Sequence, residues 1–379
     1  MKIFHINMHR QWGGQPNRVL TTSRGLRDLG HEVVVSGPRN CVLVQRARQE
    51  GFRTFDDVEL RSGFRPASLL ADIKALHAHL VAEKYDIVDT HGSQDTWRVF
   101  AALLRMPRSE RPAFIRSRHN IFPVAGHMLN SWLYQHIDHV ITVSPQVIPF
   151  LESVIPAERC TSIYSAPDVE RHIKLDDDAP AIRSRVRQEL GIAPEDVVIG
   201  VVGRLAPEKG HRYLIEAAPA IVEQVPTAKF VFAGQGRSRA DIEAQIAGLS
   251  EAMARRFHVL GFREDVPQLL RGFDVFVLPS TEGESLGTSI LEAFMAERPV
   301  VATDLGGVRE SVMDGVTGRL VPPGDAGALA HAIIEQIQQP ERAREMTMTG
   351  KRRVQELFSP EVIARQTEDV YKKVLADKR

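Results

Sequence analysis

The sequence predicts an α/β protein made of two doubly wound domains that face a cleft. Three observations lead to this prediction. The chain has 379 residues, enough for two domains with separate cores. Short apolar runs alternate with amphipathic stretches along both halves, as in parallel sheets wrapped by helices. A stretch rich in charge and proline, about residues 166–194, separates the halves and indicates a linker followed by a lead-in helix.

Five apolar runs in each half are predicted to form strands of Rossmann-like sheets. In the first half they are Ile3–Asn7, Glu32–Ser36, Asp86–Asp89, Ala113–Ser117 and His139–Val143. In the second half they are Val197–Val202, Ala228–Ala233, Arg256–Leu260, Asp274–Leu278 and Pro299–Ala302. Apolar residues at helical spacing after Gly210 predict a helix there, and Ser359 is the expected N-cap of a final amphipathic helix, residues 360–373. The expected domains are residues 1–170 and 185–358.

Composition excludes several classes of protein. Lys+Arg and Asp+Glu balance at 48 each, so net charge does not favour a nucleic-acid partner. Cys41 and Cys160 have no metal or redox spacing. No apolar run approaches the roughly 20 residues of a membrane span, and the N-terminus lacks a signal-peptide layout. We therefore expect a cytoplasmic protein, with peripheral attachment to the inner membrane face left open.

The first informative motif places two cations after a predicted strand. Gly203 and Arg204 follow Val197–Val202, and Lys209 and Gly210 open the next helix. Free amides and the dipole at a helix start favour anions, and Arg and Lys bind phosphate oxygens as a fork and as a point charge. This pattern indicates a diphosphate site, although an exposed loop with solvated cations fits it equally well.

The second motif sets two carboxylates eight positions apart, Glu284 and Glu292. Between them, the backbone amides of four residues at a helix start could hold a phosphate or a sugar hydroxyl: Leu286, Gly287, Thr288 and Ser289. Glu292 lies beside apolar residues, where a hydrogen-bonding partner such as a ribose diol would satisfy it. Helix capping by Glu284 and a salt bridge for Glu292 are the structural alternative.

Weaker signals lie elsewhere in the chain. Gly13 and Gly14 at a predicted helix start allow close approach of a ligand. His119 follows a strand and could hydrogen-bond a sugar hydroxyl or the reacting carbon's developing charge, although such a histidine is more often structural; His91 is similar. Asp176 and Asp178 match a metal-binding pair but are expected to be solvated linker charges. Gly234 and Gly236 lack the third glycine of a dinucleotide fingerprint, which disfavours a nicotinamide dehydrogenase.

In order and spacing, these motifs resemble those of the family-4 retaining glycosyltransferases of the GT-B fold. The resemblance covers nearly the whole chain, including residues 299–310 and 314–318. It implies that Arg204 and Lys209 neutralise the leaving diphosphate, that Glu284 binds the donor sugar with the backbone of 286–289, and that Glu292 binds the ribose. With His119 beside the reacting carbon, the implied catalytic residues are Arg204, Lys209, Glu284 and His119.

Further roles follow from the same resemblance. Gly13 and Gly14 would approach the donor phosphates, Gly203 would shape the cation loop, and the backbone of residues 261–266, including Arg263 and Val266, would contact the base. The final helix, residues 360–379, would return to the first domain. Two departures stand out: Leu286 replaces the usual aromatic residue, and residues 165–168 replace the usual Asn-Gly-Val-Asp at the hinge.

The implied function is transfer of a hexose-type sugar from a nucleotide diphosphate sugar to an acceptor hydroxyl, with retention of configuration. Cell-surface glycan, lipopolysaccharide or glycolipid synthesis is the expected setting. No metal and no cofactor beyond the nucleotide sugar is expected, because Arg204, Lys209 and helix amides meet the leaving charge. A nucleotide-sugar epimerase of the same fold and a non-catalytic binding subunit remain alternatives.

Charge is locally uneven. Between Arg98 and Arg118, six arginines face one acid, Glu110. In the first domain, the acceptor side in this family, such a stretch could attract a phosphorylated acceptor or an anionic membrane. Arginines scattered over a solvated helix and loop are the alternative.

Overall fold

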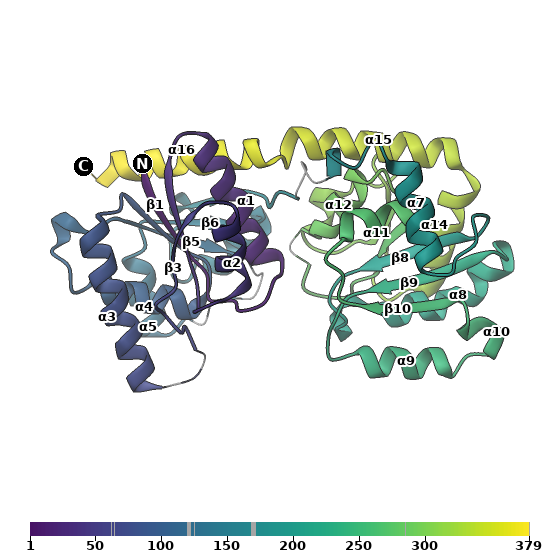
Figure 1. Cartoon of the computed structure of the whole chain (residues 1–379), viewed down its shortest axis with the longest axis horizontal. Helices are drawn as coiled ribbons and strands as arrows, with labels where there is room; N and C mark the ends of the chain where they lie inside the picture. The colour runs from purple at the N-terminus through teal and green to yellow at the C-terminus, as the bar shows by residue number, and fades with distance from the viewer. Residues whose placement is uncertain are drawn as a thin grey trace. The chain divides into compact units, whose positions relative to one another are not determined.

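The computed structural model describes residues 1–61, 63, 65–119, 123–124, 126–167, 172–284 and 286–378 (Figure 1). The chain divides into two compact units. Unit 1 comprises Met1–Ala166 together with Phe358–Arg379, and unit 2 comprises Pro167–Leu357. None of the described helices combines the length and the apolar composition that a bilayer crossing requires.

Unit 1 is built on a parallel sheet of seven strands in the order β3-β2-β1-β4-β5-β6-β7. The strands are β1 Lys2–Ile6, β2 Glu32–Ser36, β3 Arg53–Phe55, β4 Ile87–Thr90, β5 Ala113–Arg118, β6 His139–Thr142 and β7 Cys160–Ser162. Alternate residues of β1 enter different cores: Phe4 packs in one cluster and Ile3 in the other, as the two-residue period of a strand requires. Both faces of this sheet are therefore buried.

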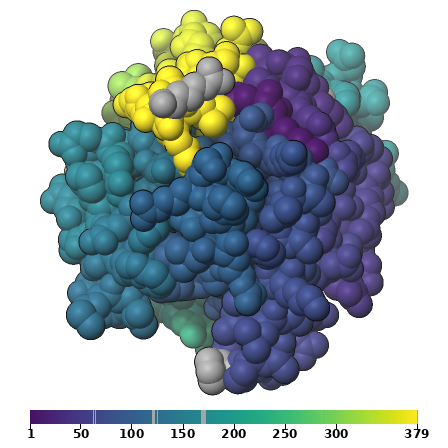
Figure 2. All heavy atoms as spheres, turned by 90° about the vertical axis from the view of Figure 1, so that its left-hand side faces the viewer, coloured from purple at the N-terminus to yellow at the C-terminus, as the bar shows by residue number. Residues whose placement is uncertain are grey.

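Helices cover both faces of the unit 1 sheet (Figure 1). They are α1 Gly14–Asp28, α2 Val42–Gln49, α3 Pro66–Glu83, α4 Ser93–Leu103, α5 Met128–Gln135 and α16 Pro360–Lys378, with short 3-10 turns η1 Arg108–Glu110, η2 Pro145–Leu151 and η3 Ala157–Arg159. The C-terminal α16 packs so tightly on α1 that a Cβ on Gly25 would lie 2.4 Å from that of Ala364. Figure 2 shows these yellow C-terminal residues against the purple N-terminal ones.

Unit 2 has a parallel sheet of six strands in the order β10-β9-β8-β11-β12-β13. Its strands are β8 Val197–Val202, β9 Ala228–Ala233, β10 Phe257–Gly261, β11 Val275–Leu278, β12 Val300–Thr303 and β13 Arg319–Val321. Its helices are α7 Ala179–Glu189, α8 His211–Gln224, α9 Arg239–Ala247, α10 Glu251–Ala254, α11 Val266–Gly272, α12 Thr288–Met295, α13 Val308–Ser311, α14 Ala326–Gln338 and α15 Pro340–Leu357, with the 3-10 turn η4 Pro207–Lys209.

The predicted fold class is confirmed: both units are doubly wound parallel sheets. Each predicted strand lies within one residue of an observed one at either end, whereas β3, β7 and β13 were not predicted. Strand order reverses beside β1 and β4 in unit 1, and beside β8 and β11 in unit 2. Ligands of such sheets bind outside the carboxyl ends of the strands at this reversal. The loops after these four strands are therefore the places to look for a site.

Candidate functional site

In unit 2, the loops after β8 and β11 are locked together. Gly210 has φ 66°, and a Cβ there would lie 1.8 Å from the carbonyl oxygen of Pro279. Only glycine fits this backbone approach and this left-handed conformation. The amide of Thr281 adds a hydrogen bond to the carbonyl of Glu208, at 2.8 Å. The segment before α8 is thereby held against the segment after β11.

This contact brings together Lys209 and Glu284, which lie 75 positions apart in sequence. Lys209 Nζ forms an ion pair with Glu284 Oε1, and the hydroxyl of Ser280 donates to the same oxygen at 2.7 Å. Glu284 is 6% exposed and Ser280 is fully buried. A buried carboxylate is retained at such a place when it is paired and hydrogen-bonded, and here its orientation is fixed by two donors.

Arg204 lies on the same loop but is held differently. Its guanidinium donates to Glu208 at 2.9 Å, and its side chain is 66% exposed. Glu208 also faces Arg237 at 3.6 Å. A hydrogen bond from its own backbone amide, followed by the nearby cations, lowers the pKa of Glu208. Arg204 and Arg237, both exposed, thus lie near Glu208, whose carboxylate stays ionised.

Glycines near this loop serve backbone packing. A Cβ on Gly234 would lie 1.8 Å from the carbonyl oxygen of Gly203, and one on Gly236 would lie 2.0 Å from that of Leu205. The amide of Leu205 donates to the carbonyl of Gln235 at 2.9 Å. The sequence Gly234-Gln235-Gly236 therefore packs directly against the backbone of residues 203–205, where the loop that carries Arg204 and Lys209 begins.

The second motif, the segment from Glu284 to Glu292, contains the start of helix α12, as predicted. Gly287 is the N-cap, with φ 69°, and Thr288 and Ser289 form the first turn, where amides lack an intrahelical acceptor. Leu286 is 2% exposed, and its carbonyl accepts from the hydroxyl of Ser311 at 2.5 Å. The residue that replaces the expected aromatic is thus a core residue here. Glu292 lies half-buried on α12. Ser285 lies outside the described residues.

The segment 261–266 places Arg263 between two acids. Its guanidinium binds Asp265 at 2.7 Å and also pairs with Glu189, and these hydrogen bonds raise the pKa of Arg263. Val266 is the first residue of α11. With the Arg263 side chain engaged in this way, the backbone is the part of this segment best suited to contact a ligand.

In unit 1, Gly13 and Gly14 stand at the start of α1, after β1. A Cβ on either would meet no atom within 4 Å. Gly13 has the extended backbone φ 175°, which any residue adopts. Neither glycine is therefore required by packing or by backbone conformation, and a ligand that approaches closely remains the predicted reason for them.

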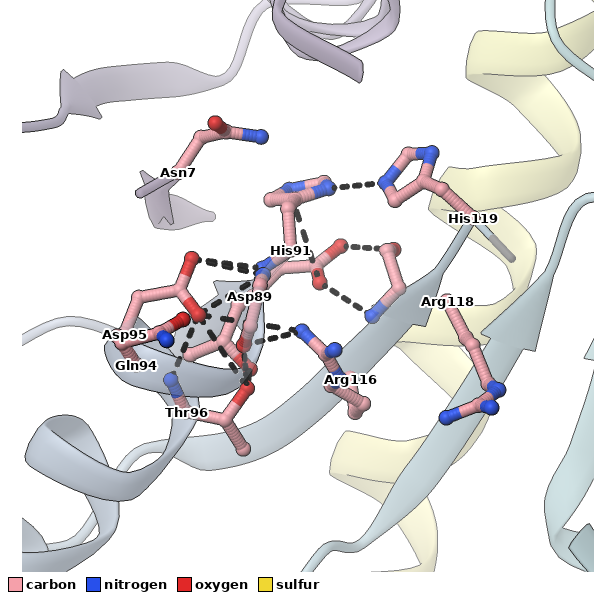
Figure 3. A network of polar contacts seen from close by, with 12 residues as sticks. Asn7, Asp89, His91, Gln94, Asp95, Thr96, Arg116, Arg118 and His119 are labelled. Atoms are coloured by element: carbon pink, nitrogen blue, oxygen red, sulfur yellow. Dashed lines mark hydrogen bonds and ion pairs between the residues drawn. The ribbon is translucent and has the colours of Figure 1, made fainter. Parts of the chain in front are cut away.

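A row of three histidines, His5, His91 and His119, crosses the carboxyl ends of β1, β4 and β5. Figure 3 shows the contact between His91 and His119. His5 Nδ1 lies 3.0 Å from His91 Nε2, and His91 Nδ1 lies 3.0 Å from His119 Nε2. We call these residues the histidine relay. Burial lowers the pKa of His5, and it lowers the pKa of His91 and His119 well below 6.5. All three rings are therefore neutral at physiological pH.

Neutrality makes the relay directional. A neutral imidazole carries one ring proton, so if His5 donates to His91, then His91 donates to His119; otherwise both bonds reverse. The state of His119 Nδ1, donor or acceptor, is thus coupled to His5. Sequence reasoning placed His119 and His91 at strand ends but missed His5, which lies inside β1.

Asp89 lies beside two of the three histidines of the relay. Its carboxylate accepts from the hydroxyls of Ser117, at 2.8 Å, and Tyr371 of α16, at 2.7 Å, and lies 3.9 Å from His5 and 3.8 Å from His91. His5, Asp89 and His91 are close enough together to be a candidate metal group. Buried Arg18 already opposes the charge of Asp89, however, and the rings of His5 and His91 hydrogen-bond each other. This arrangement fits a polar relay better than a cation site.

The structure differs from two further predictions. Asp176 is not merely solvated, because it pairs with Arg271 at 2.6 Å and Lys351 at 3.3 Å. The basic stretch is split: Arg98, Arg116 and Arg118 are buried, and Arg98 pairs with Asp72 at 2.8 Å. Attraction of an anionic membrane by Arg105, Arg108 and Arg111 stays a prediction. Asp168, the last residue of the hinge segment 165–168, lies outside the described residues.

Comparisons with known proteins assign each half of the chain to a family model. Residues 196–339 match the family model described as Glycosyl transferases group 1, and residues 12–171 match that of Glycosyltransferase Family 4. The alpha-D-kanosaminyltransferase of Streptomyces kanamyceticus is 35% identical over 195 residues, which span 51% of this chain and 48% of that relative.

Two longer matches cover most of the chain. The UDP-Gal:alpha-D-GlcNAc-diphosphoundecaprenol alpha-1,3-galactosyltransferase of Escherichia coli is 28% identical over 71% of this chain and 72% of the relative. An Anabaena protein solved in complex with UDP and glucose shares the fold, with a TM-score of 0.80, 22% identity and coverage of 98% of this chain and 99% of that one. The chain belongs to the glycosyltransferases, with the Family 4 region at residues 12–171 and the group 1 region at residues 196–339.

Proposed function

We propose that the protein is a retaining hexosyltransferase that moves a sugar from a nucleotide diphosphate sugar to an acceptor hydroxyl, in cell-surface glycan, lipopolysaccharide or glycolipid synthesis. The observation that carries the proposal is the pairing of Lys209 with buried Glu284, where the loops after β8 and β11 meet. The E. coli relative, named for UDP-Gal and a lipid-linked acceptor, supports this setting.

In this proposal unit 2 binds the donor. Lys209 and Arg204 meet the diphosphate, and the first-turn amides of α12 at Thr288 and Ser289 hold sugar and phosphate oxygens. Lys209 and Ser280 both bind Oε1 of Glu284, which fixes the carboxylate, and Oε2 accepts from a hydroxyl of the donor sugar. Glu292 accepts from the ribose, and the backbone of residues 261–266 contacts the base.

The proposed reaction breaks the bond between the anomeric carbon and the diphosphate oxygen, which keeps the electron pair. The acceptor hydroxyl forms the new bond on the same face, and its proton passes to the departing phosphate. Charge on the leaving group is met by Lys209, Arg204 and helix amides, which stabilise it most as it develops. Since these groups supply the positive charge, we propose that no metal is required.

We propose that His119 of unit 1 acts as a neutral hydrogen-bonding group beside the anomeric carbon. Burial supports this role, because it lowers the pKa of His119 and so keeps the ring uncharged where an extra cation would oppose an oxocarbenium-like sugar. The contact with His91 holds the ring in place. His91 and His5 act through His119 and are positioning residues.

The test is incubation of the protein with UDP-, GDP- and ADP-sugars, with and without glycan and glycolipid acceptors. Chromatography measures released nucleotide diphosphate, and proton NMR of the product measures the anomeric configuration. We expect acceptor-dependent release and a retained configuration. Conversion of the sugar without an acceptor would favour an epimerase, and binding without turnover on the whole panel would favour a non-catalytic subunit.

A further inference from the structure

We infer that Tyr371 of the C-terminal helix α16 is a positioning residue for His119, on which it acts through Asp89 and the histidine relay. The hydroxyl of Tyr371 donates to Oδ2 of Asp89 at 2.7 Å. The same oxygen lies 3.9 Å from His5 Nδ1, and the other carboxylate oxygen lies 3.8 Å from His91 Nε2. The consequence for catalysis rests on the proposed function; the effect on the relay rests on the contacts below.

The Asp89 carboxylate lies beside the hydrogen bond that joins His5 to His91. His5 Nδ1 and His91 Nε2 are 3.0 Å apart, and each faces one oxygen of Asp89. All three side chains are buried. A carboxylate so close to an imidazole favours the protonated ring, and Asp89 acts to raise the pKa of His5 against the larger effect of burial. Without compensation, Asp89 would therefore draw a proton onto the relay.

Hydrogen bonds to the carboxylate reduce this effect. The hydroxyls of Tyr371 and Ser117 donate to Oδ2 of Asp89, at 2.7 Å and 2.8 Å, and the amide of Ser117 donates to Oδ1 at 3.1 Å. Tyr371 is fully buried, and its burial together with the charge of Asp89 raises its pKa well above the usual range. The hydroxyl of Tyr371 therefore keeps its proton and remains a donor to Asp89.

Other charged or titratable groups also act on the three rings: Arg18 of α1, Arg116 of β5 and His9 in the loop after β1. Burial is the largest cause of the lowered pKa values of the rings, and each of these groups lowers the pKa of at least one ring further. Asp95 of α4 binds the backbone amide of His91, at 3.3 Å. Asp89 thus favours a protonated ring, and the hydroxyl of Tyr371 weakens that influence.

A neutral relay is what the proposed role of His119 requires. His91 Nδ1 lies 3.0 Å from His119 Nε2. A protonated His91 would donate from both ring nitrogens, so that His119 Nε2 could only accept. It would also bring a positive charge close to the proposed reacting carbon, where such a charge opposes an oxocarbenium-like sugar. Tyr371 therefore acts on His119 by keeping the relay uncharged.

A pH titration of the full chain with nitrogen-15-labelled imidazoles, followed by NMR without donor or acceptor, tests the effect on the relay. In Tyr371→Phe the carboxylate of Asp89 loses a donor, so the titration midpoint of His5 or His91 should rise by about one pH unit. Tyr85→Phe is the control, because this buried hydroxyl of unit 1 contacts His79, at 2.8 Å, outside the relay. Unchanged midpoints in a folded Tyr371→Phe protein would overturn the inference.

A second variant shows whether Tyr371 acts through Asp89. Asp89→Asn removes the charge, so the midpoints of His5 and His91 should fall, and the addition of Tyr371→Phe to Asp89→Asn should then change them little. An equal rise with and without the Asp89 carboxylate would contradict the pathway through this residue.

The pH dependence of kcat connects the relay to the proposed reaction. In Tyr371→Phe the acid limb of the profile should move to higher pH by the same amount as the NMR midpoint, with little change in donor KM, whereas Tyr85→Phe should keep the wild-type profile. Shifted midpoints with an unshifted profile would overturn the positioning role. Absence of turnover in the wild type would instead overturn the proposed function and leave the NMR result standing.

Discussion

His91 Nδ1 lies 3.0 Å from Nε2 of His119, and on its other side His91 Nε2 lies 3.0 Å from His5. A single ring thus connects the proposed catalytic histidine to the interior of the β1 strand. These residues are far apart in sequence: 86 positions separate His5 from His91, and 28 separate His91 from His119. The contact exists because β1, β4 and β5 are neighbours in the sheet.

Replacement of His91 by leucine is expected to lower turnover with little change in donor KM. The substitution leaves His119 Nε2 without its partner, at a cost of about 1–3 kcal/mol, which corresponds to about 5- to 160-fold in kcat. Nitrogen-15 NMR of labelled imidazoles should also show a changed tautomer balance at His119. His77→Leu, at a half-buried histidine of α3 outside the relay, is the control. An unchanged His119 tautomer and wild-type kcat in His91→Leu would contradict the positioning role.

Calorimetry with a nucleotide diphosphate and the matching nucleotide sugar is expected to distinguish the roles of Glu284 and Glu292 by the affinity that each variant loses. Glu292→Ala should weaken both ligands by about 10- to 100-fold, because its partner is the ribose. Glu284→Ala should remove mainly the extra affinity that the sugar provides. Glu216→Ala, an exposed acid of α8, is the control. Equal losses for both ligands in both variants would refute this division of roles.

Stability is expected to fall as pH falls, and His211 is a measurable part of the effect. Burial lowers the pKa of His211 to about 4, against an unfolded value near 6.5. Between these values the unfolded chain binds the proton and the folded protein does not, so stability is complete above pH 6.5 and is lost as pH drops toward 4. The loss from this residue at pH 5.5 is about 1 kcal/mol.

Urea unfolding at pH 7.5 and 5.5 measures this contribution. His211→Leu should narrow the difference between the two pH values, whereas His331→Gln, at an exposed histidine, should leave it unchanged. A His211→Leu protein with the full wild-type pH dependence would show that the ring is not neutral in the fold.

The fold was predictable because parallel strands covered on both faces appear as continuous apolar runs. The strands β3, β7 and β13 have three residues each, too few for a run or a period to stand out from a loop. The loops after β8 and β11 were predictable as motifs, but the packing of Gly210 on Pro279 that joins Lys209 to Glu284 was not, since strand adjacency is a property of the sheet order.

The basic stretch shows why local charge can mislead. In sequence, Arg116 and Arg118 belong to the same cluster as Arg105 and Arg108. In the structure the two-residue period of β5 turns Arg116 and Arg118 into the interior, while Arg105 and Arg108 remain on the surface. A sequence pattern gives the positions of charges along the chain, whereas burial depends on which helices cover each face of the strand.

The central claim is that protein cations, rather than a metal, meet the charge on a departing nucleotide diphosphate. The most direct test measures release of nucleotide diphosphate in excess EDTA by the wild type, Lys209→Ala, Arg204→Ala and the surface control Arg255→Ala. We predict that the wild type and Arg255→Ala turn over in EDTA, while Lys209→Ala and Arg204→Ala are slower by about 10²–10³-fold with the fold intact. Strict dependence of the wild type on Mg²⁺ or Mn²⁺, or wild-type turnover by the Arg204→Ala/Lys209→Ala double variant, would contradict the account.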